Sequence, residues 1–546
     1  MNIALAQLNY HIGNFEANTN KIIEHIALAK EKGADLVVFA ELAVCGYPPR
    51  DFLEFEEFIS LCETAAEKIA AHCKGIACIV GLPVRNEHVA GKDLYNAAHF
   101  IEDGKIKATV KKALLPNYDV FDEYRYFEPA TNFACIDFKG CKIALTICED
   151  LWNINNNPLY VSNPMDELIK EQPDVMLNIA ASPFSYCHDE ERVAVLADNA
   201  KKYQLPLLYV NQVGAQTELI FDGGSLVFDA TGALLDEMPY FTEALRMYEF
   251  DGKKVLHHQV TAHQAASDIE QIHDALVLGI KDYFEKSGFK KAVLGLSGGI
   301  DSALVCALAC RALGPENVMA VLMPSKYSTD HSVQDALDLV KNIGCKHEII
   351  PIKEAADAFD QMMAPAFSGL SFNLTEENIQ ARCRGIVVMA MSNKFGYILL
   401  NTSNKSECAV GYGTLYGDMC GAIGVIGDVY KTQVYQLATH INKDAEVIPL
   451  NSIVKPPSAE LRPGQKDSDS LPDYDTLDQI LFQYVELQKS SAAIIAQGFE
   501  EQLVRRIIKM VNNAEFKRYQ TPPILRVSPK AFGMGRRMPI VGKYLS

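Results

Sequence analysis

The sequence predicts an α/β protein of two domains, and three observations carry that prediction. The chain has 546 residues, which is more than one hydrophobic core accommodates. Short apolar runs typical of buried strands alternate with helical segments through the chain. Near the middle, a glycine-rich turn at residues 295–302 joins an apolar run to a helical one. The second half is therefore expected to fold as a doubly wound, Rossmann-like parallel sheet.

Composition and charge narrow the functional classes. Hydrophobic residues make up 49% of the chain and charged residues 22%, which is typical of globular proteins. A net charge of −18 argues against broad binding to nucleic-acid phosphates. The amino end lacks the basic segment of a signal peptide, and no charge-free apolar stretch reaches membrane-spanning length. We expect a cytoplasmic protein with no nucleic-acid partner and no membrane partner.

The 14 cysteines are scattered along the chain and form no Cys-x-x-Cys pair. Their spacing suggests neither a zinc site nor a disulfide framework. A reducing compartment fits this usage, and we expect most of these cysteines to be small buried side chains.

The first half alternates strands and helices. Strands are expected at residues 3–8, 36–40, 76–82, 143–147, 175–179 and 207–210, with an amphipathic helix at 16–32 and a late hairpin over 223–232. A polar, histidine-containing segment near 252–268 separates these elements from the next helix. We place the boundary there, between a domain of residues 1–262 and a domain of residues 263–546.

The second half opens with a helix at residues 269–286. The apolar run at 292–296 is expected to be a strand, and helix 303–312 and strands 318–323 and 397–401 continue the pattern. Residues 456–476 are rich in Pro, Ser, Asp and Gly and are expected to form a mobile loop. Such a loop is our candidate for a cover that keeps water from a labile intermediate.

The turn at residues 295–302 reads Gly-Leu-Ser-Gly-Gly-Ile-Asp-Ser. Backbone N–H groups at the start of a helix bind anions, and the two adjacent glycines let a phosphate approach closely. The carboxylate of Asp301 would repel that phosphate unless a divalent cation lay between them. The loop therefore predicts ATP whose pyrophosphate is bound to Mg²⁺. It lacks the Gly-Lys-Ser/Thr ending of a Walker loop, and an ordinary turn before a helix is the alternative.

Three strand ends in the first half carry reactive side chains. One predicted strand leads to Glu41, another leads to Cys148, and Lys112 lies between them in the sequence. A thiol needs a base or a cation to become a useful nucleophile, and a lysine stabilises both a thiolate and an oxyanion. The backbone N–H of Glu149 is expected at the same oxyanion. Spacing alone leaves open that these residue types follow strands by chance.

The sequence motifs around these residues resemble those of the carbon–nitrogen hydrolase, or nitrilase, superfamily. They are Phe-Ala-Glu-Leu at 39–42 with Gly-Tyr-Pro at 46–48, Leu-Pro-Asn-Tyr-Asp-Val-Phe-Asp-Glu at 115–123, and Cys-Glu-Asp-Leu-Trp at 148–152. The resemblance implies a four-layer αββα sandwich and a thioester intermediate. It also implies that Glu41 is the general base, Lys112 the oxyanion stabiliser, Cys148 the nucleophile and Glu123 a second active-site glutamate.

Residues 178–184, Asn-Ile-Ala-Ala-Ser-Pro-Phe, resemble the segment that holds a glutamine substrate in this superfamily. The resemblance implies that Tyr118 and Ser182 contact glutamine. Relatives often carry a lysine or arginine after this segment, where this chain has His188. A neutral imidazole at His188 is expected to bind the substrate carboxylate less well.

The second half carries further polar residues at and beyond strand ends. Thr402 and Glu407 follow the strand at 397–401, and Glu407 with Asp301 would complete an octahedral Mg²⁺ site. Asn378 and Arg382 lie one helical turn apart, and a solvated helix face is the alternative for Arg382 and, more so, for the neighbouring Arg384. Lys431 is predicted near a helix start, where it would meet a phosphate. The basic segments at 516–519 and 535–540 are expected to bind an anionic substrate between them as a clamp.

From residue 268 to the end, these strings resemble the NAD synthetases, which are N-type ATP pyrophosphatases. With the amidase half, the resemblance extends to the glutamine-dependent NAD synthetase family over nearly the whole chain. It implies that glutamine is hydrolysed in the first domain and that ammonia passes through an internal tunnel. The second domain then adenylates nicotinic acid adenine dinucleotide (deamido-NAD), releases pyrophosphate, and lets ammonia displace AMP to give NAD.

Residue by residue, this resemblance assigns three sets of ligands and a homo-oligomer, a dimer or higher. The ATP-binding set is Gly295, Ser297, Gly298, Gly299, Asp301, Ser302, Thr402 and Lys431. The metal-binding set is Asp301 and Glu407, and the set for deamido-NAD is Asn378, Arg382, Glu407, Asp418 and Lys517.

Three other interpretations remain. Another amidotransferase of the ATP pyrophosphatase class, making guanylate or asparagine, would use a differently built glutaminase domain. An amidase fused to a nucleotide sensor would not need the metal carboxylates Asp301 and Glu407. A non-enzymatic scaffold would not need two sets of catalytic residue types.

Overall fold

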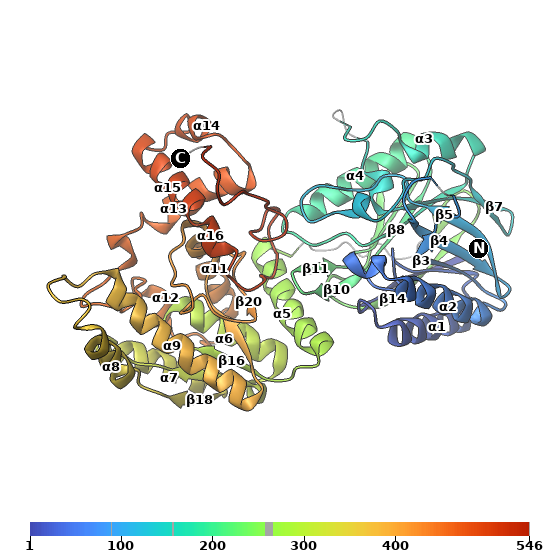
Figure 1. Cartoon of the computed structure of the whole chain (residues 1–546). Coiled ribbons are helices and arrows are strands. Elements are labelled where there is room, and N and C mark those ends of the chain that lie inside the picture. The colour runs from blue at the N-terminus through green and yellow to red at the C-terminus, as the bar shows by residue number, and fades with distance from the viewer. Residues whose placement is uncertain (89, 155–157, 257–265, 545–546) are drawn as a thin grey trace. The chain divides into compact units, whose positions relative to one another are not determined.

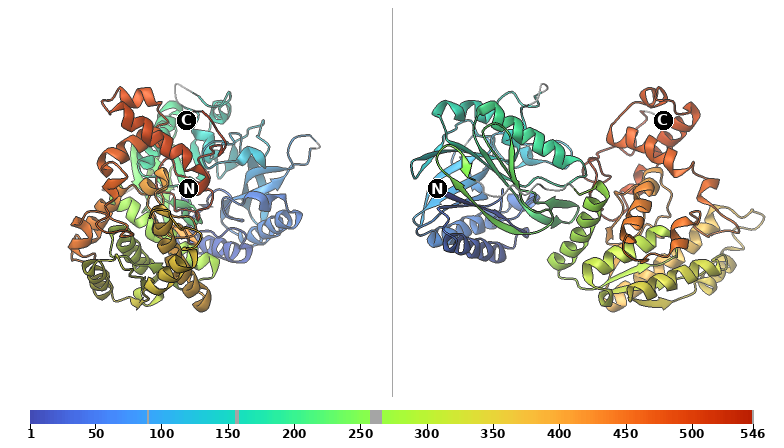
Figure 2. Two further views of the ribbon diagram at one scale, coloured as in Figure 1. Left: turned by 60° about the vertical axis from the view of Figure 1, so that its left-hand side comes forward. Right: turned by 180° about the vertical axis from the view of Figure 1, so that it is seen from behind.

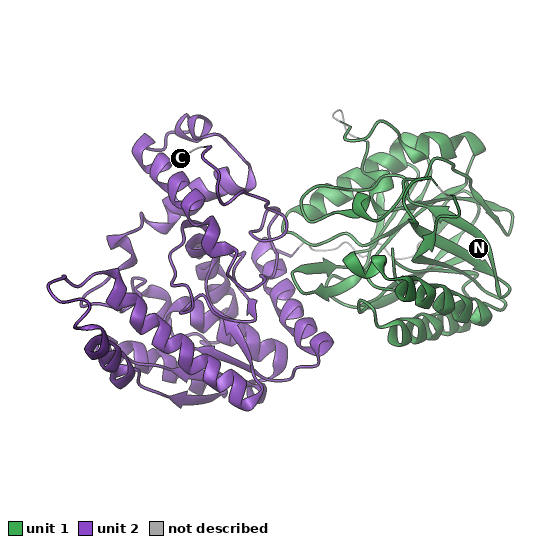
Figure 3. Cartoon of the chain, in the orientation of Figure 1, with its two compact units in different colours: residues 1–265 green, residues 266–546 purple. Residues whose placement is uncertain are grey.

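The computed structural model describes residues 1–88, 90–154, 158–256 and 266–544. The chain forms two compact units, residues 1–265 and residues 266–546 (Figure 3). The predicted boundary at 262/263 lies outside the described residues. In the described part of the chain, no helix is both long and apolar enough to cross a membrane.

Unit 1 is built on two large sheets. The seven-stranded sheet has the order β15-β14-β1-β2-β3-β4-β5, and the six-stranded sheet has the order β13-β12-β9-β8-β7-β6. The strands of the first are β1 (Asn2–Gln7), β2 (Leu36–Val38), β3 (Ala77–Arg85), β4 (Leu94–Glu102), β5 (Lys105–Lys111), β14 (Ala244–Phe250) and β15 (Val255–Leu256). Those of the second are β6 (Ile136–Phe138), β7 (Cys141–Ile147), β8 (Val175–Ala180), β9 (Leu207–Asn211), β12 (Leu226–Phe228) and β13 (Leu234–Glu237). Strands β10 (Val213–Gln216) and β11 (Leu219–Asp222) form a separate pair.

The alternation of side chains along β1 explains the layers of unit 1. Ile3 and Leu5 join the core between the two sheets, whereas Ala4 and Ala6 pack with the helices α1 (Phe15–Glu31) and α2 (Glu56–His72). The helices α3 (Pro164–Leu168) and α4 (His188–Tyr203) pack on the second sheet (Figure 1). The helix, sheet, sheet, helix order confirms the predicted αββα sandwich.

Unit 2 contains a five-stranded sheet of order β18-β17-β16-β19-β20, and every neighbouring pair is parallel. Its strands are β16 (Ala292–Gly295), β17 (Val318–Leu322), β18 (Lys346–Ile349), β19 (Ile398–Asn401) and β20 (Ile423–Gly424). The order grows from β16 toward β18 and then reverses to β19. Because parallel crossovers are right-handed, this reversal places the connecting helices on both faces of the sheet. The predicted doubly wound sheet is therefore confirmed.

The helices of unit 2 follow that topology. The helix α9 (Leu374–Phe395) packs through Val388 onto the face of the sheet that carries Val293 and Leu399. The other large helices are α5 (Asp268–Ser287), α6 (Ile300–Leu313), α7 (Asp330–Ile343), α8 (Lys353–Met363) and α11 (Lys431–Ile441). Of these, α6 lies against β16 and β17 and also contacts α5, α7 and α11. The helix α6 thus connects the glycine-rich turn to the core of unit 2.

A helical layer closes the carboxyl-terminal part of unit 2 (Figure 2, orange to red). It comprises α10 (Lys405–Val410), α13 (Tyr474–Leu481), α14 (Ser491–Ile495), α15 (Glu501–Asn513) and α16 (Glu515–Arg518), while the short α12 (Leu450–Val454) packs on α6 and α7. The predicted loop at 456–476 is mostly irregular, and Leu461 in it is buried with its carbonyl bonded to Gln380 of α9. The covering role of this loop stays a prediction.

Two candidate catalytic sites

The first candidate site is a buried network of charges at one end of the strands of unit 1. Lys112, directly after β5, places its Nζ 2.7 Å from Oε1 of Glu41 and 2.9 Å from both carboxylate oxygens of Glu123. Lys112 and Glu41 are fully buried, and Glu123 is 5% exposed. The fold therefore brings Glu41 beside Lys112 across 71 residues of sequence, and Glu123 joins them from 11 residues beyond Lys112.

Buried charges are costly unless they are paired and hydrogen-bonded, and this network meets that condition. Asn96 donates to Glu41 at 2.7 Å, and Tyr47 donates to Glu123 at 2.9 Å. Burial opposes the charge of Lys112, but the two carboxylates outweigh it and raise the pKa of the ammonium well above its usual value. Neither Asn96 nor Tyr47 was predicted as a site residue, although Tyr47 lies in the Gly-Tyr-Pro motif at 46–48.

Cys148 follows β7 at a sharp turn, where its backbone φ is +44°. The carboxylate of Asp150 holds this turn, since it accepts hydrogen bonds from the N–H of Ile147 and from those of Ala113 and Leu114. These bonds link the cysteine turn directly to the residues after Lys112. Burial and Glu41 raise the pKa of the Cys148 thiol, while Lys112 lowers it. The thiol is thus protonated at neutral pH and requires a base.

A third carboxylate, that of Glu149, follows Cys148 directly in the chain. Glu149 accepts hydrogen bonds from the hydroxyls of Tyr118 at 2.9 Å and Tyr160 at 3.0 Å. Burial raises the pKa of Glu149 to about 7. Sequence reasoning used only the backbone N–H of Glu149 and missed its side chain and Tyr160. The Tyr118 that the resemblance places at the substrate is 42% exposed, so it lies at the entrance of the site.

The structure also brings Ser182 and His188 together. The hydroxyl of Ser182 lies 3.3 Å from Nε2 of His188, and the imidazole stacks on Trp152 with ring centroids 5.2 Å apart. The backbone N–H of Ser182 donates to Asn211 at 2.9 Å. Asn211 in turn donates to Asp222, which pairs with the buried Arg192. These supporting residues have no sequence signal of their own, because they come from separate elements.

The second candidate site is the turn between β16 and α6 in unit 2. Gly298 has a φ of +83°, and a Cβ there would lie 2.1 Å from the carbonyl oxygen of Ser332. Glycine is therefore required at this position. The hydroxyls of Ser297 and Ser302 lie 3.1 Å apart, and Ser297 Oγ accepts from the N–H of Gly299 at 3.2 Å. At the end of β16, a Cβ on Gly295 would lie 2.9 Å from the side chain of Met323.

Asp301 lies in the first turn of α6 and contacts two residues from other elements. Its carboxylate pairs with the ammonium of Lys431, at the start of α11, and accepts a bond from Asn404 at 2.9 Å. Asn404 caps α10 and also accepts the N–H of Glu407. Burial and the neighbouring Asp301 raise the pKa of Glu407 well above its usual value. The carboxylates of Asp301 and Glu407 repel one another and lie beside the glycine-rich turn at 295–302. Such a pair fits a divalent cation such as Mg²⁺.

The residues predicted for the dinucleotide gather around the segment 411–418. Asn378 accepts the hydroxyl of Thr414 at 2.7 Å, and Arg382 donates to the carbonyl of Leu415 at 3.2 Å. Asp418 accepts the N–H of Thr414 at 2.6 Å, and Lys517 donates to the carbonyls of Gly411 and Gly413. The residues Asn378, Arg382, Asp418 and Lys517, from three separate stretches of sequence, are therefore drawn to one segment.

Arg384 and the basic segments near the carboxyl end make contacts of their own, and the role of Thr402 in binding ATP stays a prediction. Thr402 is half-buried and follows β19. Arg384 is half-buried and donates to the carbonyl of Met323 at 3.2 Å, so its guanidinium is not simply solvated. In the basic segments near the carboxyl end, Arg518 and Arg536 each form an ion pair with Glu515 at 2.6 Å. These two guanidiniums therefore form internal ion pairs, and the anion clamp stays a prediction for the other basic residues of these segments.

Comparison with known proteins matches both units to described families. Residues 2–255 match the carbon–nitrogen hydrolase family, and residues 272–521 match the NAD synthase family. The chain is thus a carbon–nitrogen hydrolase joined to an NAD synthase. It belongs to the glutamine-dependent NAD(+) synthetase family.

The membership rests on relatives that match over the whole chain. The glutamine-dependent NAD(+) synthetase of Synechocystis sp. is 46% identical over 98% of this chain and 98% of its own length. That of Acinetobacter baylyi is 41% identical over 99% of this chain and 98% of its own length. The solved structure of the Acinetobacter baumannii enzyme in complex with ADP is 38% identical, covers 100% of this chain and 99% of its own, and has a TM-score of 0.79. That of the Cytophaga hutchinsonii enzyme, at 21% identity, covers 100% and 98% with a TM-score of 0.84 and supports the fold.

Proposed function

We propose that this chain makes NAD from deamido-NAD, ATP and glutamine, and that it releases AMP and pyrophosphate. It is a ligase of NAD biosynthesis with a built-in glutaminase. The observation that carries this proposal is the presence in one chain of two charged sites, the Lys112–Glu41 pair beside Cys148 and the Asp301–Lys431 pair beyond the glycine-rich turn. The names of the full-length relatives support the same reaction.

In the glutaminase reaction, Glu41 takes the proton of the Cys148 thiol, and the sulfur attacks the amide carbon of glutamine. Lys112 and the backbone N–H of Glu149 stabilise the negative oxygen of the tetrahedral intermediate. Glu41 returns its proton to the leaving nitrogen, which departs as ammonia and leaves a thioester on Cys148. Water, deprotonated by Glu41, then releases glutamate. Glu123 keeps Lys112 charged and positioned through its two bonds at 2.9 Å.

Glutamine carries an ammonium group and a carboxylate beside its α-carbon, and the entrance offers partners for both. Glu149 is the acidic group held by Tyr118 and Tyr160, which makes it the partner for the ammonium. Ser182 and His188 are the partners for the carboxylate. A protonated His188 would bind that carboxylate more strongly than a neutral one, and the carboxylate of Glu191 lies 3.4 Å from its Nδ1.

In the synthetase reaction, an oxygen of the nicotinate carboxylate attacks the α-phosphorus of ATP and pyrophosphate leaves. Ammonia then attacks the acyl carbon and AMP leaves. The hydroxyls and N–H groups of the turn at 295–302, with Thr402 and Lys431, hold the phosphates of ATP. Asp301 and Glu407 would hold Mg²⁺, which when bound neutralises the oxygens of the leaving pyrophosphate. Asn378, Arg382, Asp418 and Lys517, with Glu407, hold deamido-NAD against the segment 411–418.

The remaining assignments belong to the same proposal. Residues 1–262 act as the amidase domain and residues 263–546 as the synthetase domain. The enzyme works in the cytoplasm, where its three small-molecule substrates occur, and as a homo-oligomer of two or more copies. Sedimentation of the purified chain tests the last statement, because a species of 60.4 kDa would contradict it.

The decisive experiment measures NAD formation from deamido-NAD, ATP and Mg²⁺, with glutamine in one arm and ammonium in the other. Wild type is expected to use both nitrogen sources, and Cys148→Ala is expected to use only ammonium. Removing Mg²⁺ with a chelator is expected to stop both reactions and to leave glutamine hydrolysis intact. A wild-type protein that makes no NAD from either source would show that another carboxylate is the substrate.

A further inference from the structure

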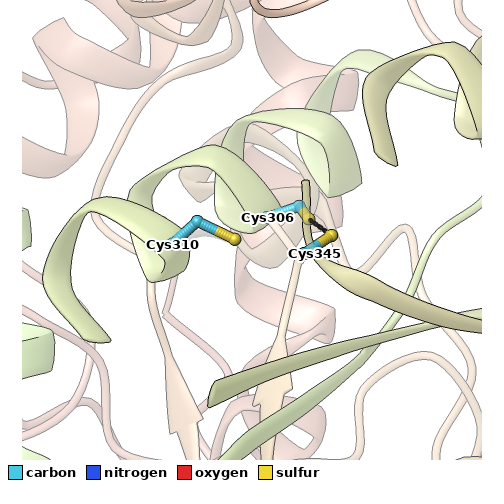
Figure 4. Close-up of side chains that lie close together, drawn as sticks. All are labelled: Cys306, Cys310 and Cys345. Atoms are coloured by element: carbon cyan, nitrogen blue, oxygen red, sulfur yellow. Dashed lines mark hydrogen bonds between the residues drawn. The ribbon is translucent and has the colours of Figure 1, made fainter. Parts of the chain in front are cut away.

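Three cysteines that the proposed reaction does not use lie together in unit 2. Cys306 and Cys310 are one helical turn apart on α6, and Cys345 lies directly before β18. The three sulfurs all lie within 4.8 Å of one another, and Sγ of Cys306 is 3.9 Å from Sγ of Cys345 (Figure 4). All three residues are buried, with Cys310 and Cys345 each 7% exposed.

The spacing of the sulfurs matches a shared metal ion better than a disulfide. A tetrahedral zinc ion with Zn–S bonds of about 2.3 Å keeps two thiolate sulfurs about 3.8 Å apart. A disulfide requires a sulfur–sulfur distance of about 2.0 Å. The observed 3.9 Å between Cys306 and Cys345 therefore needs almost no movement to bind zinc. Forming a disulfide would require the two sulfurs to approach by nearly half of that distance.

We propose that Cys306, Cys310 and Cys345 form a binding site for Zn²⁺. Three thiolates are a usual ligand set for zinc and occupy three of its four tetrahedral positions. The fourth position is left to a water molecule, because among the described residues no imidazole or carboxylate joins the three sulfurs within 4.8 Å. The sequence does not suggest such a site, because the three ligands come from two separate elements.

The position of the cluster gives the ion a structural consequence. The helix α6 starts at the glycine-rich turn, and Cys306 lies five residues beyond Asp301, or about 7.5 Å along the helix axis. Its partner Cys345 leads into β18, which is the edge strand of the parallel sheet. Zinc bound here would connect α6, which follows the glycine-rich turn, to the edge of the sheet, independently of the reaction proposed above.

The test measures zinc bound to the full-length, reduced protein after excess Zn²⁺ has been removed by gel filtration. The triple variant C306S/C310S/C345S is expected to bind one zinc ion fewer per chain than wild type. Cys383→Ser, which changes another buried cysteine of unit 2, is the matched control and is expected to bind as wild type does. Circular dichroism spectra of all variants verify that each is folded.

Cobalt provides a second measurement that needs no variant. Co²⁺ added to the reduced wild-type protein is expected to give the near-ultraviolet charge-transfer band of thiolate ligands and the intense red-region bands of tetrahedral geometry. Cys148→Ala is expected to keep these bands, which separates them from the thiol of the glutaminase site. The proposal is overturned if wild type gives no thiolate band, or if the folded triple variant binds as much zinc as wild type.

Discussion

The ammonium of Lys112 lies 2.7 Å from the carboxylate of Glu41, and both side chains are fully buried. A second carboxylate, that of Glu123, contacts the same ammonium at 2.9 Å. The arrangement gives one cation two acidic neighbours beside a cysteine. The two carboxylates therefore keep the ammonium of Lys112 charged, as its proposed role of oxyanion stabiliser requires.

Replacing Lys112 by methionine is expected to lower the rate of glutamine hydrolysis by a factor of about 10² or more, because an oxyanion donor is lost. The loss of the cation between the two buried carboxylates is also expected to destabilise unit 1 by about 3–5 kcal/mol. Lys107→Met, on the exposed face of β5, is the control. The measurements are glutamate release and thermal unfolding. Hydrolysis within tenfold of wild type would remove Lys112 from the role of oxyanion stabiliser.

The raised pKa of Glu149 predicts a pH dependence of glutamine binding. Burial raises the pKa of Glu149 to about 7, so the carboxyl group loses its charge as the pH falls below that value. The uncharged form cannot pair with the substrate ammonium, and KM for glutamine is expected to rise about tenfold per pH unit below pH 7. KM should change little above pH 8.

The control for this prediction is Glu149→Gln, whose KM for glutamine should be high and free of the pH 7 transition. The reaction with ammonium in wild type provides a second reference, because it does not use the glutamine site. A transition that persists unchanged in Glu149→Gln would assign the titration to another group.

Gly298→Ala is expected to destroy ATP binding. Its Cβ would lie 2.1 Å from the carbonyl oxygen of Ser332, so the turn has to move. Gly288→Ala is a matched control, because Gly288 also has a positive φ, of +76°, but no atom lies within 4 Å of its Cβ position. The control isolates the cost of left-handed backbone, about 1–2 kcal/mol. Steady-state KM for ATP and thermal unfolding are the measurements, and an unchanged KM in folded Gly298→Ala would contradict the prediction.

Lys405 is expected to be essential for the stability of unit 2. Its buried ammonium lies 2.7 Å from Glu486, 2.9 Å from Asp428 and 2.7 Å from the hydroxyl of Ser528. Lys405→Met removes the cation between two buried carboxylates, which costs about 3–5 kcal/mol. The unfolding temperature of unit 2 should fall by about 6 °C or more. The exposed Lys443→Met is the control, and equal unfolding temperatures for the two variants would show that the pairing contributes little.

Most elements of the fold could be predicted from local pattern. Period-two and continuous apolar runs gave β1, β7, β8 and β9 within two residues of their observed bounds, and the helix expected at 269–286 is α5, Asp268–Ser287. Strand β2 is shorter than expected, ending at Val38, because the chain turns toward Glu41 and Leu42 adopts a positive φ. Edge strands such as β15 and β20 were missed, since two-residue strands have no periodicity to detect.

The candidate sites divide in the same way. The turn at 295–302 could be predicted from its residues and context, whereas Glu41, Lys112 and Cys148 were singled out by the motifs around them, which resemble the nitrilase superfamily. Asn96, Tyr160 and the Arg192–Asp222 pair have common residue types in ordinary positions, and only packing reveals what they contact. Arg518 and Arg536 are a further example. Their charge predicts an anionic ligand, and only the structure reveals that both form ion pairs with Glu515.

The sequence by itself determined the two-domain α/β architecture, the cysteine-based amidase chemistry and the glycine-rich turn at 295–302, because these depend on patterns within a few neighbouring residues. Only the tertiary structure decided which charges meet. It set Lys112 between Glu41 and Glu123, joined Asp301 to Lys431 across 130 residues, and gathered Cys306, Cys310 and Cys345. Such contacts arise where strand ends and helices converge in space, and electrostatic and hydrogen-bond energies depend on those distances rather than on separation along the chain.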